Sequence, residues 1–147
     1  MIQIPGDTGV TLASIPSVLD NEDVTKAYET AIEGLTTLVA KPEDIDPTTR
    51  TSWLGAYTLC PPAIRGLHVG RVVDLDFFEK EGAKDLPILN IHGKEDKRLA
   101  YQPIADYLDK IYSNVESHFP EGVGHSPFYE KPETLREPLL KFVARLY

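Results

Sequence analysis

The sequence predicts an α/β fold in which a helical segment precedes a unit with parallel strands. Residues 87–93 form a short, nearly continuous apolar run, which is typical of a parallel strand buried on both faces. Residues 99–112 then show helical spacing of apolar side chains, and residues 115–119 alternate like a second strand. A strand, a helix and a strand in this order make one βαβ unit, and such units belong to parallel sheets.

The preceding part of the chain is predicted to be helical and irregular. Apolar residues recur at helical spacing over about residues 22–40, and a helix there is expected to stop before Pro42. A second helix is expected to start near Pro47, run through Thr58 and end at Pro61-Pro62. A third is expected over 62–69, followed by a short helix or turn at residues 77–78. Short helices punctuated by proline, with no strand between them, favour a lid rather than a self-contained bundle.

The chain is therefore divided into a helical lid, residues 1–85, and the C-terminal α/β part, residues 86–147. A strongly amphipathic helix over residues 132–147 closes the second part. Two parallel strands alone make a poor sheet, because both edges and both faces need partners. An open sheet edge predicts either self-association or pairing with a separate N-terminal half.

Composition excludes several classes of protein. Hydrophobic residues make up 41% and charged residues 26% of the 147 residues, as in soluble globular proteins. The formal charge of -8 argues against a nucleic-acid partner, since phosphate binding needs clustered cations. No apolar run reaches the roughly 20 residues that span a bilayer. With one cysteine, Cys60, and no signal-peptide pattern after Met1, the expected location is the cytoplasm.

Asp96 is the first candidate for chemistry, because it stands just past the end of the predicted strand over residues 87–93. Open α/β sheets place their sites at the carboxyl ends of strands. A carboxylate there accepts the Nδ1 proton of a histidine, fixes its tautomer and stabilises the imidazolium that forms. The structural alternative is that Asp96 caps the helix that begins near Leu99. Its neighbour Glu95 is a weaker candidate for the same role.

His125 is the second candidate, and it lies between Gly124 and Ser126 in a glycine-rich loop. Glycines there allow a tight turn that places an imidazole at the edge of a pocket. Its role would be general base toward a nucleophile and then general acid toward the leaving group. A lone loop histidine is more often an ordinary surface residue, but its separation from Asp96 by one βαβ unit favours the functional interpretation.

A metal site built from His92, Asp96 and His125 is a further alternative. No tightly spaced cluster of cysteine, histidine or aspartate supports it, so we expect no metal and no cofactor. His92 is interpreted as a packed or hydrogen-bonding framework residue, and His68 and His118 carry no motif.

A nucleophile is missing from the sequence. A nucleophile elbow needs Gly-x-Ser-x-Gly, or Cys or Asp in place of Ser, after an apolar strand and before a helix. Ser126 has Gly124 before it, but Phe128 occupies the other glycine position. Cys60 lacks both glycines, and Asp7 follows only a four-residue apolar stretch. An enzyme that uses Asp7 or Ser126 by itself is the least favoured interpretation.

The acid and histidine motifs together resemble those of the α/β-hydrolase family, in its esterase, epoxide hydrolase and haloperoxidase-like group. Residues 86–96 are similar to the family's seventh strand and acid turn, and residues 122–133 to its histidine loop and the start of its last helix. The resemblance implies that Asp96 is the triad acid and His125 the triad base. It also implies an incomplete α/β-hydrolase fold, because the family's first strands, oxyanion loop and nucleophile elbow are absent from the sequence. The lid matches the family only in general character.

The resemblance implies a hydrolase acting on esters or related small apolar substrates, truncated and inactive alone because the nucleophile is missing. Lid residues suggest an apolar acyl or ring-bearing substrate, although packing explains them equally well: Trp53, Tyr57, Leu67, Phe77 and Phe78. The alternative is a non-catalytic binding or assembly protein that reuses the half-fold.

Overall fold

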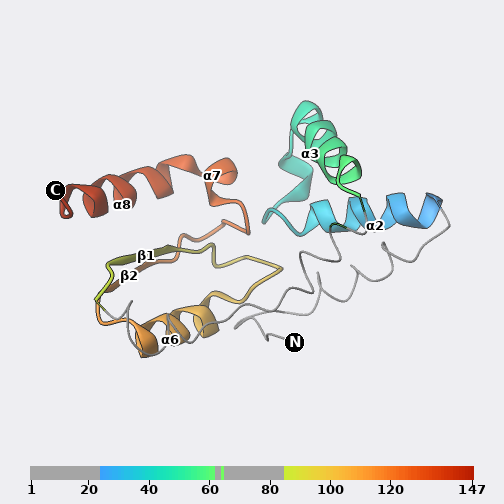
Figure 1. Ribbon diagram of the computed structural model, residues 1–147. Helices are drawn as coiled ribbons and strands as arrows, with labels where there is room; N and C mark the ends of the chain where they lie inside the picture. Colours follow the sequence, from blue (N-terminus) through green and yellow to red (C-terminus); the bar gives the residue numbers. More distant parts are fainter. Residues whose placement is uncertain (1–23, 62–63, 65–84) are drawn as a thin grey trace.

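The structure is a computed structural model that describes residues 24–61, 64 and 85–147 (Figure 1). Its elements, in chain order, are α2 (Val24–Thr36), the 3-10 helix η1 (Pro42–Asp44), α3 (Pro47–Leu59), β1 (Ile88–Ile91), α6 (Tyr101–Ile111), β2 (Val115–His118), α7 (Pro127–Glu130) and α8 (Pro132–Ala144). Of the helix predicted over 62–69, only Ile64 is described, and it is helical. The predicted turn at residues 77–78 lies outside the described residues. None of the described helices is long and apolar enough to span a membrane.

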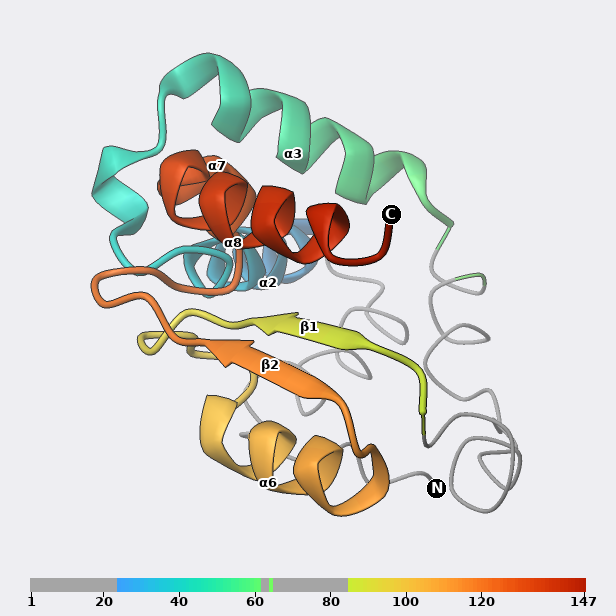
Figure 2. The same ribbon diagram turned by 90° about the vertical axis from the view of Figure 1, so that its left-hand side faces the viewer.

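The predicted βαβ unit is confirmed. β1 and β2 pair in parallel, with Ile88 opposite Val115 and Ile91 opposite His118, and α6 connects them. α6 packs against β2 and α8 against β1. The two helices lie on opposite sides of the strand pair (Figures 1 and 2). The described part of the chain therefore has the layered arrangement of an α/β fold.

The expectation that the first strand is buried on both faces is not met. All four residues of β1 and all four of β2 are only half-buried. Within the described residues the sheet has two strands, so each strand keeps one edge without a strand partner. Three apolar side chains of α8, Leu139, Leu140 and Val143, are also more than 40% exposed, as is Leu146 just after the helix. Within the described residues, no further strand pairs with these edges, so the sheet offers little apolar surface to bury the strands.

α2 ends earlier than predicted, at Thr36 rather than near residue 40. The last turn tightens, because the amides of Thr37 and Leu38 bond to carbonyls three residues back, Gly34 and Leu35, at 3.3 and 3.0 Å. The Thr37 hydroxyl also donates to the Gly34 carbonyl at 2.8 Å. Val39 then leaves the helical path and is 2% exposed. Burial of Val39 and side-chain bonding by Thr37 therefore end the helix before Pro42 does.

α3 follows the predicted bounds closely. Asp46 is its N-cap and accepts from the Thr49 amide at 3.0 Å, and Pro47 occupies the first helical position. Trp53 on α3 packs edge-on against Tyr129 of α7, with ring centroids 4.9 Å apart. The Tyr129 hydroxyl also donates to the Asp46 carboxylate at 3.2 Å. α3 is thereby tied to the helix that follows the histidine loop.

Candidate active site

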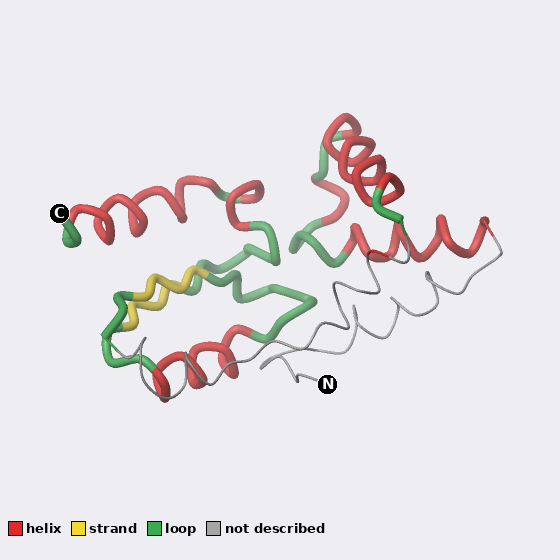
Figure 3. The backbone as a smooth tube through the Cα atoms, in the orientation of Figure 1, coloured by secondary structure: helices red, strands yellow, loops and turns green. Residues whose placement is uncertain are grey.

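Asp96 lies in the loop that follows β1, and His125 lies in the loop that follows β2. Figure 3 shows both loops in green, on the side of the strands toward α2. The Nδ1 atom of His125 is 2.8 Å from Oδ2 of Asp96. The Asp96 side chain is 2% exposed and that of His125 is 32% exposed, so the acid is buried beneath an accessible imidazole. The structure thus brings the two predicted residues into direct contact.

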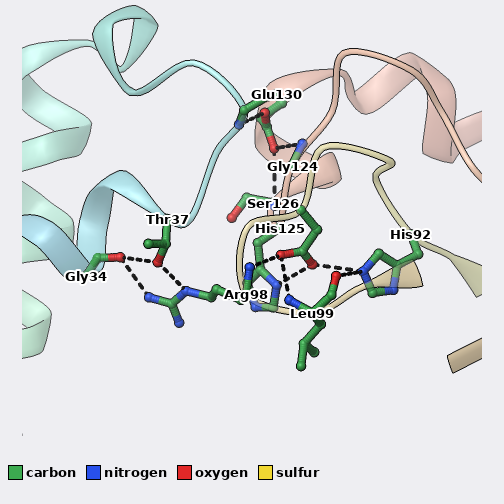
Figure 4. Close-up of polar contacts among 11 residues, drawn as sticks. Gly34, Thr37, His92, Arg98, Leu99, Gly124, His125, Ser126 and Glu130 are labelled. Atoms are coloured by element: carbon green, nitrogen blue, oxygen red, sulfur yellow. Dashed lines mark hydrogen bonds and ion pairs between the residues drawn. The ribbon is translucent and has the colours of Figure 1, made fainter. Parts of the chain in front are cut away.

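Asp96 also has a structural role, through its other oxygen. Oδ1 accepts from the backbone amides of Arg98 and Leu99 at 2.7 and 3.1 Å (Figure 4). The first residue of α6 is Tyr101, and its N-cap position is held by Ala100. Asp96 therefore closes the turn before α6 without capping the helix itself. The helix-cap interpretation is therefore wrong: Oδ1 closes the turn over Arg98 and Leu99, and the helix begins only at Tyr101.

Oδ2 of Asp96 accepts from a second imidazole. His92 Nε2 is 2.9 Å from this oxygen and 3.0 Å from the Leu99 carbonyl oxygen. Both neighbours are acceptors, so Nε2 must carry the proton. His92 is thus a hydrogen-bonding framework residue, as the sequence suggested.

These bonds keep Asp96 ionised. Burial raises the pKa of the Asp96 carboxyl, but hydrogen bonds from His125, His92 and the amides of Arg98 and Leu99 outweigh it and hold the pKa well below its usual range. An ionised carboxylate can only accept hydrogen bonds, so neutral His125 carries its proton on Nδ1 and leaves a lone pair on Nε2. This is the tautomer that a general base needs.

The Asp96 carboxyl is expected to make stability fall with acid. Its pKa is lower in the folded chain than in the unfolded chain, where an aspartate has a pKa near 3.9. Its stabilisation is complete above the unfolded value and is lost as the pH falls toward the folded value. In urea unfolding at several pH values, the difference in unfolding free energy between wild type and Asp96→Asn should be largest near neutral pH and should shrink below about pH 5. A difference that is constant down to pH 2 would contradict this.

Backbone bonds join the turn of residues 93–99, called here the acid turn, to the loop of residues 119–126, called the histidine loop. The Lys94 amide donates to the Pro120 carbonyl at 3.1 Å, and the Glu95 amide donates to the Val123 carbonyl at 2.9 Å. The Glu95 carboxylate accepts from the Val123 amide at 3.0 Å. Backbone bonds from Gly122 and Val123 lower the pKa of Glu95, although burial raises it. Glu95 therefore holds the histidine loop, whereas Asp96 contacts the histidine itself.

Gly93 permits the close approach of these two loops. A Cβ atom at this position would lie 2.2 Å from the carbonyl oxygens of both Val123 and Gly124. Real Cβ atoms do not come this close to backbone oxygens, so only glycine fits here.

Three solved structures share this arrangement of elements. The esterase RhEst1 from a Rhodococcus species aligns over 97% of this chain and 50% of its own, with a TM-score of 0.79 and 20% identity. The esterase EaEST from Exiguobacterium antarcticum aligns over 91% and 47%, with a TM-score of 0.64 and 19% identity. The 2-hydroxy-6-oxo-6-phenylhexa-2,4-dienoate hydrolase BphD from a Rhodococcus species aligns over 98% and 51%, with a TM-score of 0.65 and 16% identity.

The chain has the fold of the C-terminal half of an α/β-hydrolase. It spans about half the length of the solved structures that it matches. No family model matches the sequence. No curated protein matches it either.

Among the residues that the structure describes, the other candidates do not join the pair. Ser126 is 3% exposed, and in the part of the chain that the structure describes no hydrogen bond links its hydroxyl to His125. Cys60 follows the end of α3, and His118 contacts Glu116 at 2.7 Å. Asp7 and His68 lie outside the described residues. Two surface hollows lie along α8, and neither includes a residue of the acid turn or the histidine loop.

A metal is not supported by the donor geometry. His92 and His125 both direct a protonated nitrogen at the same Asp96 oxygen, at 2.9 and 2.8 Å, which leaves no lone pair facing a shared cation. No group of three or more metal-binding side chains is found among residues 24–61, 64 and 85–147.

Sequence reasoning missed two residues that support the site, Arg98 and Glu130. The Arg98 guanidinium donates to the Gly34 carbonyl and to the Thr37 hydroxyl, each at 2.8 Å. Burial lowers the pKa of Arg98, although nearby Asp96 raises it. The only local signal for Arg98 is its place two residues after the candidate acid. Its contacts join parts of the chain too distant in sequence for a pattern to indicate them.

Proposed function

We propose that Asp96 and His125 form the acid–base pair of a hydrolase active site that acts on esters or related small apolar substrates. The observation that carries the proposal is the 2.8 Å bond between His125 Nδ1 and an ionised, 2% exposed carboxylate. The fold shared with two esterases supports an ester as the substrate class. The ring of Trp53 packs on Tyr129, so this residue is explained by packing without a substrate.

In the proposed reaction, His125 Nε2 removes the proton from an attacking hydroxyl, and the hydroxyl oxygen bonds to the ester carbonyl carbon. Asp96 stabilises the imidazolium that results and does not take up the proton. His125 then donates this proton to the leaving alkoxide as the ester C–O bond breaks. Water attacks the acyl intermediate by the same proton transfers and releases the acid.

The nucleophile in this proposal comes from polypeptide outside these 147 residues. The sequence contains no Gly-x-Ser-x-Gly, and the chain spans about half of each matched hydrolase. The amides of Ile88 and His92 bond toward β2, so the alternate residues Leu89 and Ile91 turn their backbone groups to the other edge of β1. That edge is suited to a strand of an N-terminal half. Without that nucleophile, the 147 residues alone are inactive in this proposal. The location that we propose for the protein is the cytoplasm, because a chain with a single cysteine fits a reducing compartment.

Two measurements test this proposal. The first maps the transcript upstream of Met1, where an in-frame extension with Gly-x-Ser-x-Gly after an apolar strand would identify the nucleophile. The second joins the N-terminal half of RhEst1 to this chain and measures hydrolysis of p-nitrophenyl acetate. We expect hydrolysis by the joined protein, its loss in His125→Ala, and none by the 147 residues alone. A folded joined protein without activity would contradict the assigned pair, and His125-dependent activity of the chain alone would contradict its inactivity.

The exposed apolar residues of α8 favour a second candidate function, a non-catalytic assembly protein. Leu139, Leu140 and Val143 of α8 are 42%, 58% and 42% exposed. In this case a second copy covers the helix and the β1 edge. Sedimentation distinguishes the two candidates, since a stable dimer that does not hydrolyse esters after joining to an N-terminal half would favour assembly.

A further inference from the structure

We infer that Glu130 is a positioning residue, which holds the loop of His125 in place against Asp96. The inference rests on the proposed function and extends it to a residue that contacts neither a substrate nor the imidazole. Its basis is the contacts of residues 34–40, the last residues of α2 and the loop that follows it toward η1, which are called here the bracket segment. Both the acid turn and the histidine loop are attached to it.

Glu130 attaches the histidine loop to the bracket segment. Its Oε1 atom accepts from the amide of Gly124 at 2.8 Å and from that of Ser126 at 3.3 Å, the two residues that flank His125. Its Oε2 atom accepts from the amide of Ala40 at 2.7 Å. One carboxylate thus bonds to backbone on both sides of the histidine and to the bracket segment.

The acid turn holds the same segment from the other direction. Arg98 donates to the Gly34 carbonyl and the Thr37 hydroxyl, and its own amide donates to Asp96. Lys97 donates through Nζ to the carbonyl of Ala40 at 3.0 Å. The Ala40 residue is therefore bound at its amide by Glu130 and at its carbonyl by Lys97. The loop of His125 and the turn of Asp96 are therefore both bonded to the bracket segment, which fixes their positions relative to each other.

The contact between the histidine loop and the bracket segment is also tight. A Cβ atom on Gly124 would lie 2.5 Å from the Ala40 nitrogen and 2.7 Å from the Val39 carbonyl carbon. Gly124 and Val39 are both buried.

Three amide donors converge on Glu130, and a carboxylate is the side chain that accepts at every position. A glutamine would place an NH₂ group against one of these donors.

The test compares Glu130→Gln with the matched control Glu133→Gln, an exposed glutamate in the first turn of α8. NMR of the chain follows the ¹³C titration of the Asp96 carboxyl, the Nδ1 proton of His125 and amide exchange. In Glu130→Gln we expect the Asp96 midpoint to rise toward its ordinary value, the Nδ1 proton signal to be lost, and the Ala40 or Gly124 amide to exchange about tenfold faster, as the loss of one hydrogen bond implies. Glu133→Gln should match the wild type in all three.

A second variant distinguishes the effect of the length of the Glu130 side chain from the effect of its charge. Glu130→Asp keeps the charge but is one methylene shorter, so it cannot bridge Gly124 and Ala40, and we expect the same upward shift of the Asp96 midpoint. A folded Glu130 variant with an unchanged Asp96 midpoint and an unchanged Nδ1 proton would overturn the inference. Unfolding of both variants would also overturn it, because Glu130 would then serve the fold as a whole. None of these readouts needs a nucleophile, so failure here is distinct from failure of the proposed hydrolysis.

Discussion

Replacing Asp96 with asparagine is expected to lower kcat of the joined hydrolase by a factor of about 10³ to 10⁴, with a small change in KM. An amide in place of the carboxylate removes the negative charge that stabilises the imidazolium. It also presents an NH₂ donor or a neutral oxygen to His125 Nδ1, which allows the wrong tautomer. Because the carboxylate is 2% exposed, water cannot take its place. The measurement is p-nitrophenyl acetate hydrolysis by the RhEst1 chimera described above.

The matched control for this substitution is Asp109→Asn, which changes an exposed aspartate of α6. It should leave kcat within a factor of two, in line with an exposed charge away from the site. Equal losses in Asp96→Asn and Asp109→Asn would show that Asp96 has no part in the reaction.

His92→Ala removes one of the two imidazoles bonded to Asp96 and leaves the other in place. We expect it to lower kcat by about tenfold, the effect of one lost hydrogen bond to a charged group.

Replacing Gly93 with alanine is expected to destabilise the chain by about 3 kcal/mol or more, a value at the upper end for overpacking. The added methyl group would meet the carbonyl oxygens of Val123 and Gly124, and these are backbone atoms that cannot rotate away. The same two loops carry Asp96 and His125, so their separation should also raise the Asp96 pKa toward its ordinary value. Urea unfolding and the ¹³C titration measure the two effects.

Gly55 offers the control for this second substitution. It lies inside α3, and a Cβ atom there would meet nothing within 4 Å. Gly55→Ala should therefore stabilise the chain, by about 0.4 to 1 kcal/mol, because alanine has the higher helix propensity. A Gly93→Ala variant as stable as the wild type would show that the loops separate without cost, and that their contact is not needed for the fold.

The parts of the fold that depend on local pattern were predictable. The apolar run before His92, the helical spacing after Leu99 and the alternation after Val115 predicted β1, α6 and β2, and their parallel pairing followed from the βαβ order. α3 was predicted from Pro47, and its N-cap Asp46 lies just before it. Each of these features depends on residues a few positions apart, so sequence spacing contains the information.

The end of α2 was predicted wrongly, because its cause is not local. Val39 leaves the helix to be buried, and Arg98 binds the carbonyl of Gly34 from a loop 64 residues away. The half-burial of β1 was also missed. The apolar composition of a strand is typical of the interior of a parallel sheet, but it does not tell how many strands lie beside it in the described structure.

For the candidate site, the sequence by itself determined the residue types and their topological places, with Asp96 after the first strand and His125 after the second. Parallel strands bring their carboxyl ends to one edge, so proximity followed from the order of the elements. Only the tertiary structure decided that one Asp96 oxygen binds two histidines while the other closes a turn, and that Glu130 connects the histidine loop to Ala40. These are bonds between loops, whose partners depend on how the helices and strands pack and not on any period in the sequence.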